Sequence, residues 1–387
     1  MLKHKKFYGW KVYHELLPKI CARLDPTRPY WPSSPYGGLD MNSELIGDRH
    51  AWDIYLGRQG ESRVYYKDFK TDRGKFISEF GFLAPPIMDT LKRCLPEDEI
   101  RPGSPSWNFH NNTFERDAVR YALKVHFNRE IEDLSLEEYL ILSQTYQAEA
   151  YRYALSHFRR RQYCTSGALF WMFSDCWGAT TGWTIVDYYL NRKPSFYAVK
   201  RVFAPIMVSF KEEENGISIW LVNGMLEDIR GQLEYGWGTF DSDKLRVLGR
   251  EEVMVIANTS KELAQISFPK LSDEEQRNLY YWVRFKRDGQ IVSEDRYFLV
   301  PWKDLKLAPV KLEYSLEPLG NDEYVLRIKA DRFAWMVEVK FRESEVKIND
   351  NYFDLLPGET REVLLKGPRE AVEKLSVNAL NNLLVKK

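Results

Sequence analysis

The segment Lys75-Phe76-Ile77-Ser78-Glu79-Phe80-Gly81-Phe82 carries the strongest fold signal in this chain. It begins as a run of β-branched and aromatic residues, which is typical of a strand, and the carboxylate of Glu79 stands at the end of that run. Gly81 then allows a turn, and Pro85-Pro86 opens an apolar segment of helical pattern. In a (β/α) barrel the carboxyl ends of the strands form the active site, so the segment predicts a functional glutamate. A lone Glu after a strand is more often a solvated cap or a salt-bridge partner, and the neighbouring motifs must decide.

The composition is that of an ordinary globular protein with many aromatic side chains. Of the 387 residues, 44% are hydrophobic and 14% are aromatic, and the length suggests two or three domains. Aromatic rings suit sugar binding because the face of a pyranose packs on them, although most of these rings must belong to the core. The 56 basic and 56 acidic residues cancel, which argues against a nucleic acid or an anionic membrane as partner.

The sequence predicts neither a targeting segment nor a metal site. The basic start leads into Phe7-Tyr8-Gly9-Trp10-Lys11 rather than into an apolar core, so no signal peptide is predicted. No apolar run approaches the 18 residues of a membrane span. The four cysteines and six histidines are scattered without metal-ligand spacing. We therefore expect reduced thiols, a cytoplasmic location and neither a metal nor an organic cofactor.

The pattern of the chain changes near residue 205. Before it, strand-like and helix-like segments alternate, which indicates parallel strands with helical crossovers. After it, short period-two runs separated by turn residues predict two β-sandwiches in series. The predicted strands of the first part are residues 25–34, 47–53, 75–79 and 167–175, and its predicted helices include 8–23, 136–161 and 195–203. The predicted strands of the second part include 217–222, 230–237, 252–257, 280–286, 296–300, 324–328 and 335–341.

Five segments together resemble the C-terminal half of a β-mannosidase of glycoside hydrolase family 2. They are DPTRPYWPSSPYGG (25–38), GDRHAW (47–52), KFISEFGF (75–82), GALFWMFSDCWGATTGWTIVDY (167–188) and DNYFDLLPGE (350–359). The first four are long and stand in the family order. The resemblance implies that residues 1–204 form strands five to eight of a (β/α)8 TIM barrel. It implies two immunoglobulin-like β-sandwiches for residues 205–305 and 306–387.

The same resemblance implies a retaining exo-β-mannosidase, which releases terminal β-linked D-mannose from oligosaccharides. In such enzymes one carboxylate attacks the anomeric carbon, and a second protonates the leaving oxygen and then activates water. Glu79 stands in the position of the nucleophile. Because a nucleophilic carboxylate must be ionised, we expect polar or cationic neighbours around Glu79.

Six further residues are candidates for substrate binding. His50 and Trp52 match the family's GDxHxW segment, and His50 is either a hydrogen-bond donor to sugar or to Glu79, or a purely structural histidine. The indoles could form the platform under the sugar, although core packing is the commoner role of each one alone. The carboxylate Asp175 follows Ser174 where such enzymes often carry Asn-Asp. The full set is Trp31, His50, Trp52, Trp171, Asp175 and Trp177.

The acid/base glutamate of the family is not recognisable in this sequence. In the family it follows two asparagines shortly before the DPTRPYW segment, whereas Asn111-Asn112 is followed by Thr113 and lies elsewhere. Glu15 lies in a helical stretch and does not fit. We therefore expect that the chain begins after the acid and that a complementary N-terminal half chain supplies it. Half a barrel would leave open edges and an apolar side, which demand a partner.

Two alternatives stay open at this point. The chain could be a non-catalytic remnant that binds carbohydrate or serves as a structural subunit. It could also belong to a family 2 glycosidase that acts on another β-glycoside, such as a galactoside, a glucuronide or a glucosaminide.

Overall fold

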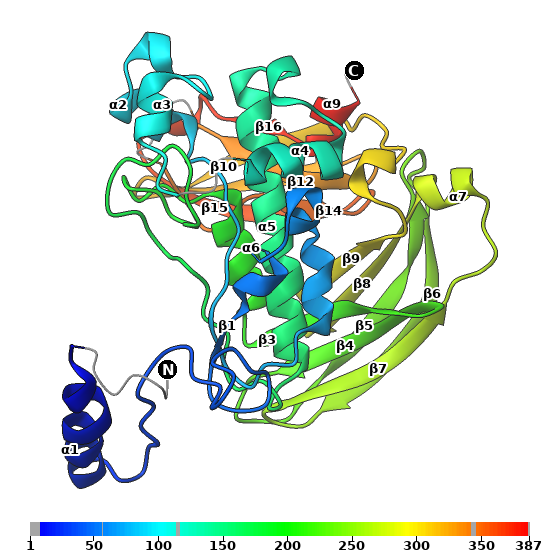
Figure 1. Ribbon diagram of the computed structural model, residues 1–387. Coiled ribbons are helices and arrows are strands. Elements are labelled where there is room, and N and C mark those ends of the chain that lie inside the picture. The colour runs from blue at the N-terminus through cyan, green and yellow to red at the C-terminus, as the bar shows by residue number, and fades with distance from the viewer. Residues whose placement is uncertain (1–7, 56, 114–116, 342–345, 386–387) are drawn as a thin grey trace.

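The computed structural model describes residues 8–55, 57–113, 117–341 and 346–385 (Figure 1). The long helix α5 runs through the middle of the molecule. The sandwich built from β3 to β9 lies on one side of it, and the second sandwich packs near its N-terminal end. The short helix α1 lies apart from the body.

The first part of the chain is mainly helical and irregular. Its helices are η1 (Val12–Leu16), α1 (Leu17–Leu24), η2 (Ala51–Ile54), η3 (Gly60–Val64), η4 (Tyr66–Thr71), α2 (Met88–Cys94), η5 (Glu97–Glu99), α3 (Pro105–Phe109), α4 (Ala118–Phe127), η6 (Ile131–Asp133), α5 (Leu136–Arg160) and α6 (Pro194–Val202). The predicted helices 136–161 and 195–203 are thus confirmed as α5 and α6. α5 begins with a capping box, in which Ser135 and Glu138 satisfy each other's backbone N–H groups.

The parallel pairing that carries the carboxyl edge joins three segments of this part. β1 (Arg49–His50) pairs in parallel with β2 (Ile77–Glu79). On the other side of β2, Leu169 N donates to Ile77 O at 2.8 Å and Trp171 N donates to Phe80 O at 2.7 Å, so residues 167–171 run alongside. The three carboxyl ends therefore meet at one edge, as the sequence predicted.

The predicted strand over residues 25–34 was wrong. These residues form turns and bends, with no strand among them. The physical reason is the spacing of Pro26, Pro29 and Pro32, because each proline removes the N–H that a ladder would need. Residues 167–175 are also not a continuous strand but an extended segment with isolated bridges.

Aromatic rings from β2 and α5 make the core of the first part. Phe80 and Phe82 are fully buried directly after Glu79, and both pack edge-on against Tyr151 of α5. Phe80 also contacts Phe158, which lies about two turns further along the same face of α5. Most of the aromatic excess is thus core, and it fixes the strand that ends in Glu79 against a rigid helix.

The second part consists of two antiparallel β-sandwiches. In the first, the sheet β3-β4-β7 faces the sheet β6-β5-β8-β9 over a core of Ile219, Leu233, Val283 and Phe285. In the second, β10-β11-β15-β13 faces β14-β12-β16. The bounds are β3 (Ile206–Glu213), β4 (Gly216–Asn223), β5 (Ile229–Thr239), β6 (Leu245–Val255), β7 (Thr259–Ser267), α7 (Asp273–Asn278), β8 (Leu279–Arg287), β9 (Gln290–Phe298), η7 (Trp302–Asp304), β10 (Leu312–Gly320), β11 (Glu323–Ala330), β12 (Ala334–Lys340), β13 (Lys347–Ile348), β14 (Phe353–Leu355), β15 (Thr360–Lys366), α8 (Arg369–Val372), β16 (Ser376–Asn378) and α9 (Leu380–Leu384).

A buried ionic cluster joins the three parts of the molecule. Arg296 of β9 pairs with Glu149 of α5 at 2.5 Å and with Asp354 of β14 at 2.8 Å. Burial alone would raise the pKa of Glu149, but Arg152 and Arg296 outweigh it and lower that pKa to about 2. Glu149 is therefore an anion held between two guanidinium groups, and Arg296 is the cation shared by all three parts.

Removing this shared cation should loosen the junction. Arg296→Met leaves the partly buried Asp354 without its cation and the buried Glu149 with Arg152 alone, so we expect the free energy of unfolding to fall by about 3–5 kcal/mol. Urea denaturation followed by circular dichroism measures it. Arg327→Met is the matched control, because Arg327 forms exposed ion pairs with Glu317 and Glu362 and should change little. Equal effects of the two substitutions would contradict the structural role of Arg296.

Several large apolar side chains are exposed near the ends of the first part. Trp31, Trp171 and Phe173 are between 41% and 57% exposed, and η1 and α1 contain no buried residue.

None of the described helices is long and apolar enough to cross a membrane. Within the described residues, no three His, Cys, Asp or Glu side chains lie close enough together to bind a metal ion, and the four cysteines are free thiols.

Candidate active site

Glu79 is placed by the pairing of two short parallel strands. It ends β2, and in the register of β1 with β2 its partner is His50. Ile77, two residues earlier, is fully buried, so the strand is anchored in the core and its last side chain reaches the carboxyl edge of the sheet. The side chains of His50 and Glu79 are 21% and 28% exposed, which leaves both accessible to a ligand.

Two polar neighbours contact the same oxygen of Glu79. Trp52 donates its indole N–H to Oε2 at 3.0 Å, and Nδ1 of His50 lies 3.4 Å from Oε2. These are the polar neighbours that the sequence led us to expect around an ionised carboxylate. Within the described part of the chain, both of these contacts go to Oε2 of Glu79, and no hydrogen bond to Oε1 is found.

The indole of Trp52 is itself held in place by packing. Its ring meets the buried ring of Trp183 edge-on, with centroids 6.2 Å apart. Its ring N–H donates to Glu79, which lies 27 residues further along the sequence. Trp52 thus orients the carboxylate, a contact that we did not predict when we named it as a sugar-binding residue.

The other predicted tryptophans lie in different surroundings. Trp31 packs on Tyr36 at a centroid distance of 4.6 Å, and Trp171 follows the strand-like segment 167–171 with its side chain partly in solvent. Trp177 stacks on His110 at 4.8 Å, with their planes 12° apart. Trp31 and Trp171 therefore offer exposed ring surface, whereas one face of Trp177 is covered by a histidine.

Asp175 is tied into a buried polar group. Its carboxylate accepts hydrogen bonds from Thr184 at 2.8 Å and from Asn112 at 3.5 Å. Burial raises the pKa of Asp175, while the hydroxyl of Thr184 and the nearby Lys193 lower it in part. Burial also lowers the pKa of Lys193 to about 8. These contacts give Asp175 a role in fixing residues 175–184, and contact with sugar stays a prediction.

Sequence reasoning missed the polar residues that surround His50. Ser34 and Ser78 both donate to Oδ2 of Asp48, at 2.6 Å and 2.5 Å, and Oγ of Ser34 lies 3.1 Å from Nε2 of His50. All of them stand inside the quoted motifs, at positions 34, 48 and 78. That location was the available signal, but the motifs alone do not tell which side chains meet.

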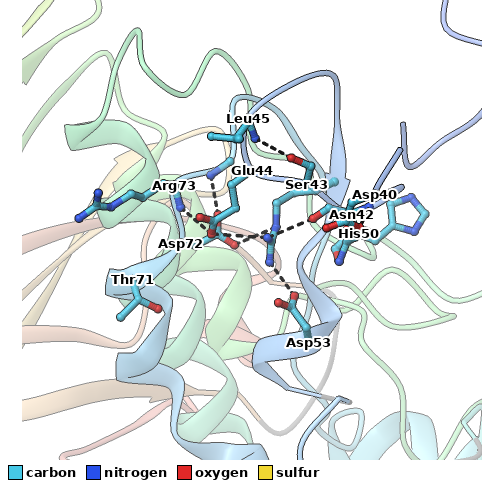
Figure 2. A network of polar contacts seen from close by, with 12 residues as sticks. Asp40, Asn42, Ser43, Glu44, Leu45, His50, Asp53, Thr71, Asp72 and Arg73 are labelled. Carbon is cyan, nitrogen blue, oxygen red and sulfur yellow. Dashed lines mark hydrogen bonds and ion pairs between the residues drawn. The ribbon is translucent and has the colours of Figure 1, made fainter. Parts of the chain in front are cut away.

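Arg49 anchors this region from the buried side of the strand. Its guanidinium pairs with Asp53 at 2.6 Å and with Asp72 at 3.2 Å, and it also contacts Glu44 and the carbonyl of Asn42. Figure 2 shows these contacts converging from the 40–45 loop, η2 and the end of η4. The loop and the strand end are thereby held together around one buried cation.

Each of the two sandwiches matches a known domain family. Residues 215–304 match the Mannosidase Ig/CBM-like domain, and residues 307–383 match an Ig-fold domain of mannosidases. Both matches agree with the two β-sandwiches expected from the strand pattern and with the immunoglobulin-like fold that the family resemblance implied.

Comparison with whole proteins extends the likeness over the first part. The chain is 30% identical to β-mannosidase B of Aspergillus terreus over 92% of its own length and 44% of that protein, and 31% identical to that of Aspergillus niger over 95% and 45%. It superposes on the crystal structure of β-D-mannosidase from Dictyoglomus thermophilum with a TM-score of 0.88 and 32% identity, covering 98% of this chain and 46% of that one. An exo-chitosanase of Amycolatopsis orientalis, 17% identical with a TM-score of 0.61, shares the fold.

The chain spans less than half the length of the curated relatives that it matches. The likeness covers nearly all of this chain, from the segment before Glu79 to the second sandwich. The chain is therefore homologous to the C-terminal part of the β-mannosidases of glycoside hydrolase family 2.

Proposed function

We propose that this chain is the nucleophile-bearing part of a retaining exo-β-mannosidase, with Glu79 as the nucleophile. The observation that carries the proposal is the pair of contacts at the end of β2, where Trp52 and His50 both contact Oε2 of Glu79. A carboxylate held in this way has a fixed orientation, which a nucleophile needs. The homology to β-mannosidases supports mannose as the sugar.

The reaction follows from this assignment. Oε1 of Glu79 attacks the anomeric carbon, the glycosidic bond breaks, and the leaving oxygen takes a proton from an acid on the other side of the sugar. Water, deprotonated by the same acid/base, then attacks the glycosyl ester and releases mannose with its configuration retained. His50, Trp31 and Trp171 are the side chains that we assign to sugar contact, because one face of Trp177 is covered by His110 and Asp175 is engaged by Thr184 and Asn112.

The acid/base belongs to a part of such enzymes that these 387 residues do not contain. The matched relatives are more than twice as long as the aligned region, and the solved β-mannosidase is covered over 46% of its length. We therefore assign residues 1–204 to half of a (β/α)8 barrel, residues 205–305 and 306–387 to the two sandwiches, and the acid to the other half of the barrel.

The exposed aromatic edge fits this assembly. Trp31, Leu169, Trp171 and Phe173 are each at least 41% exposed on the first part of the chain, and α1 lies away from the body without a buried residue. Exposed apolar surface beside unpaired backbone is a template for further strands. The occupant we infer is the N-terminal half of a β-mannosidase, and a cytoplasmic location stays a prediction.

A mechanism-based reagent tests the nucleophile directly. A 2-deoxy-2-fluoro mannosyl fluoride should form a stable ester with Glu79 in the assembled enzyme, because fluoride leaves readily and the fluorine slows hydrolysis of the ester. Mass spectrometry of peptides would locate the label. A label on Glu44 or Asp48, or full activity without any label, would contradict the assignment.

The choice of sugar needs its own measurement. A panel of aryl β-glycosides that includes mannoside, galactoside, glucuronide and glucosaminide compares kcat/KM values on the same assembled enzyme. The mannoside should be preferred. A preference for another member would keep the mechanism and change the substrate, and inactivity towards all of them would favour a non-catalytic carbohydrate-binding or structural role.

A further inference from the structure

A chain of polar contacts leads from a carboxylate that is not at the reaction centre to the nucleophile. Asp48 accepts from Ser34 at 2.6 Å, Oγ of Ser34 lies 3.1 Å from Nε2 of His50, and Nδ1 of His50 lies 3.4 Å from Oε2 of Glu79. Both nitrogens of one imidazole are thus engaged, one on each side of the ring. Which nitrogen carries the proton depends on the hydrogens of its neighbours.

Counting hydrogens settles the side of Ser34. An ionised carboxylate only accepts, and Asp48 faces three donors, namely the hydroxyls of Ser34 and Ser78 and the backbone N–H of Tyr36. A serine hydroxyl has one hydrogen. For Ser34 the candidate acceptors besides the ring are Asp48 at 2.6 Å and Oγ of Ser78 at 3.3 Å, and the shorter contact to the charged acceptor takes the hydrogen. Oγ of Ser34 can then only accept from the ring, so Nε2 of His50 must carry a hydrogen.

The position of the ring is fixed from the backbone as well. The side chain of Asn42 donates to the carbonyl of His50 and accepts from its N–H, both at 2.9 Å. The guanidinium of Arg49 is occupied by Asp53, Asp72 and Glu44. Among the described residues, the charged groups that reach the imidazole are Glu79 by direct contact and Asp48 through Ser34.

We propose that Asp48 is a positioning residue that acts through Ser34 to keep the proton of the neutral His50 ring on Nε2. Any proton on Nδ1 is then a second one, and it gives the ring a positive charge directly against the nucleophile. With the opposite tautomer, a neutral ring would donate to Glu79 and no cation would face it. The proposal rests on the assignment of Glu79 as nucleophile only for its catalytic meaning, since the tautomer itself is a property of the free chain.

Nitrogen-15 NMR of the histidine-labelled chain tests the proposal without any activity. The chain has six histidines, and His50→Gln assigns the signal of interest by its loss. In the wild type, the neutral ring at the high-pH end of a titration should show Nε2 as protonated and Nδ1 as bare. In Ser34→Ala and in Asp48→Asn, the claim on Nε2 is lost, and the proton should move to Nδ1, which then donates to Glu79.

The same chain offers reference signals and a matched control. Burial lowers the pKa of His126 and His157 to about 4, and each donates from Nε2 to a carbonyl at 2.8 Å, so both report a neutral ring protonated on Nε2. His110 contacts a carbonyl through Nδ1 at 2.6 Å and reports the other tautomer. Ser34→Thr keeps the hydroxyl and should keep the wild-type pattern.

Each outcome decides the proposal. A wild-type ring that carries its proton on Nδ1 when neutral would overturn it, and so would a wild-type pattern retained in both Ser34→Ala and Asp48→Asn. Unchanged signals of His126 and His157 show that a variant is folded. If the tautomer moves as expected while the assembled enzyme fails to hydrolyse any mannoside, the relay stands and only the proposed reaction fails.

Discussion

Replacing Glu79 with Gln is expected to lower kcat/KM on an aryl β-mannoside by at least about 10⁴-fold in the assembled enzyme. The amide keeps the size of the side chain and can still accept the N–H of Trp52, so the fold and the packing after β2 should be preserved. What is lost is the carboxylate oxygen that forms the glycosyl ester in the proposed mechanism. Steady-state kinetics on a purified variant, with circular dichroism for the fold, measures the effect.

The control for this substitution is a carboxylate outside the site. Glu97 lies exposed in η5, and Glu97→Gln should leave kcat/KM unchanged. Added azide or formate should partly restore the Glu79→Gln variant, because a small anion can take the place of the missing carboxylate. Normal turnover by Glu79→Gln would remove Glu79 from the mechanism.

Adding the N-terminal half of a β-mannosidase is expected to raise hydrolysis of mannobiose by at least about 10²-fold over this chain alone. A positioned general acid contributes about 10²–10⁴-fold, and poor leaving groups depend on it most. Activated aryl mannosides need no proton on the leaving oxygen, so any activity of the lone chain should favour them. Parallel assays of both substrates, with and without the first half of a β-mannosidase, give the ratio.

The same experiment has a structural readout. Alone, the chain should self-associate or bind a hydrophobic dye through the surface around Trp31 and Trp171, and the complex should do neither. Size-exclusion chromatography with light scattering reports both states. A variant of the added half in which the acid Glu is changed to Gln should still form the complex but should not restore mannobiose hydrolysis. A dye-silent monomer that ignores the added half would contradict the assembly.

Local sequence patterns determined the elements whose signal lies within one stretch of chain. Period-two alternation predicted the strands seen as β4, β5, β8 and β11, because every second side chain must enter a sandwich core. The pattern from Leu136 predicted α5, whose capping box Ser135–Glu138 lies within four residues. The run that ends in Glu79 predicted a carboxylate at a strand end, since β-branched and aromatic residues and a following glycine are local features.

Tertiary structure decided the contacts that span the chain. Glu149, Arg296 and Asp354 meet from three separate parts, and no local pattern distinguishes them from surface charges. Residues 25–34 looked like a strand, but prolines and the lack of a pairing neighbour left them irregular.

The chemistry of the site shows the same division. The sequence named Glu79, His50 and Trp52 as candidates, because they stand in recognisable motifs. That Trp52 donates to Glu79, and that Asp48 reaches His50 through Ser34, follows only from the parallel pairing of β1 with β2 and from the loop that Arg49 holds against them. Hydrogen bonds depend on distances of a few tenths of an ångström between side chains far apart in sequence, and only the folded chain sets those distances.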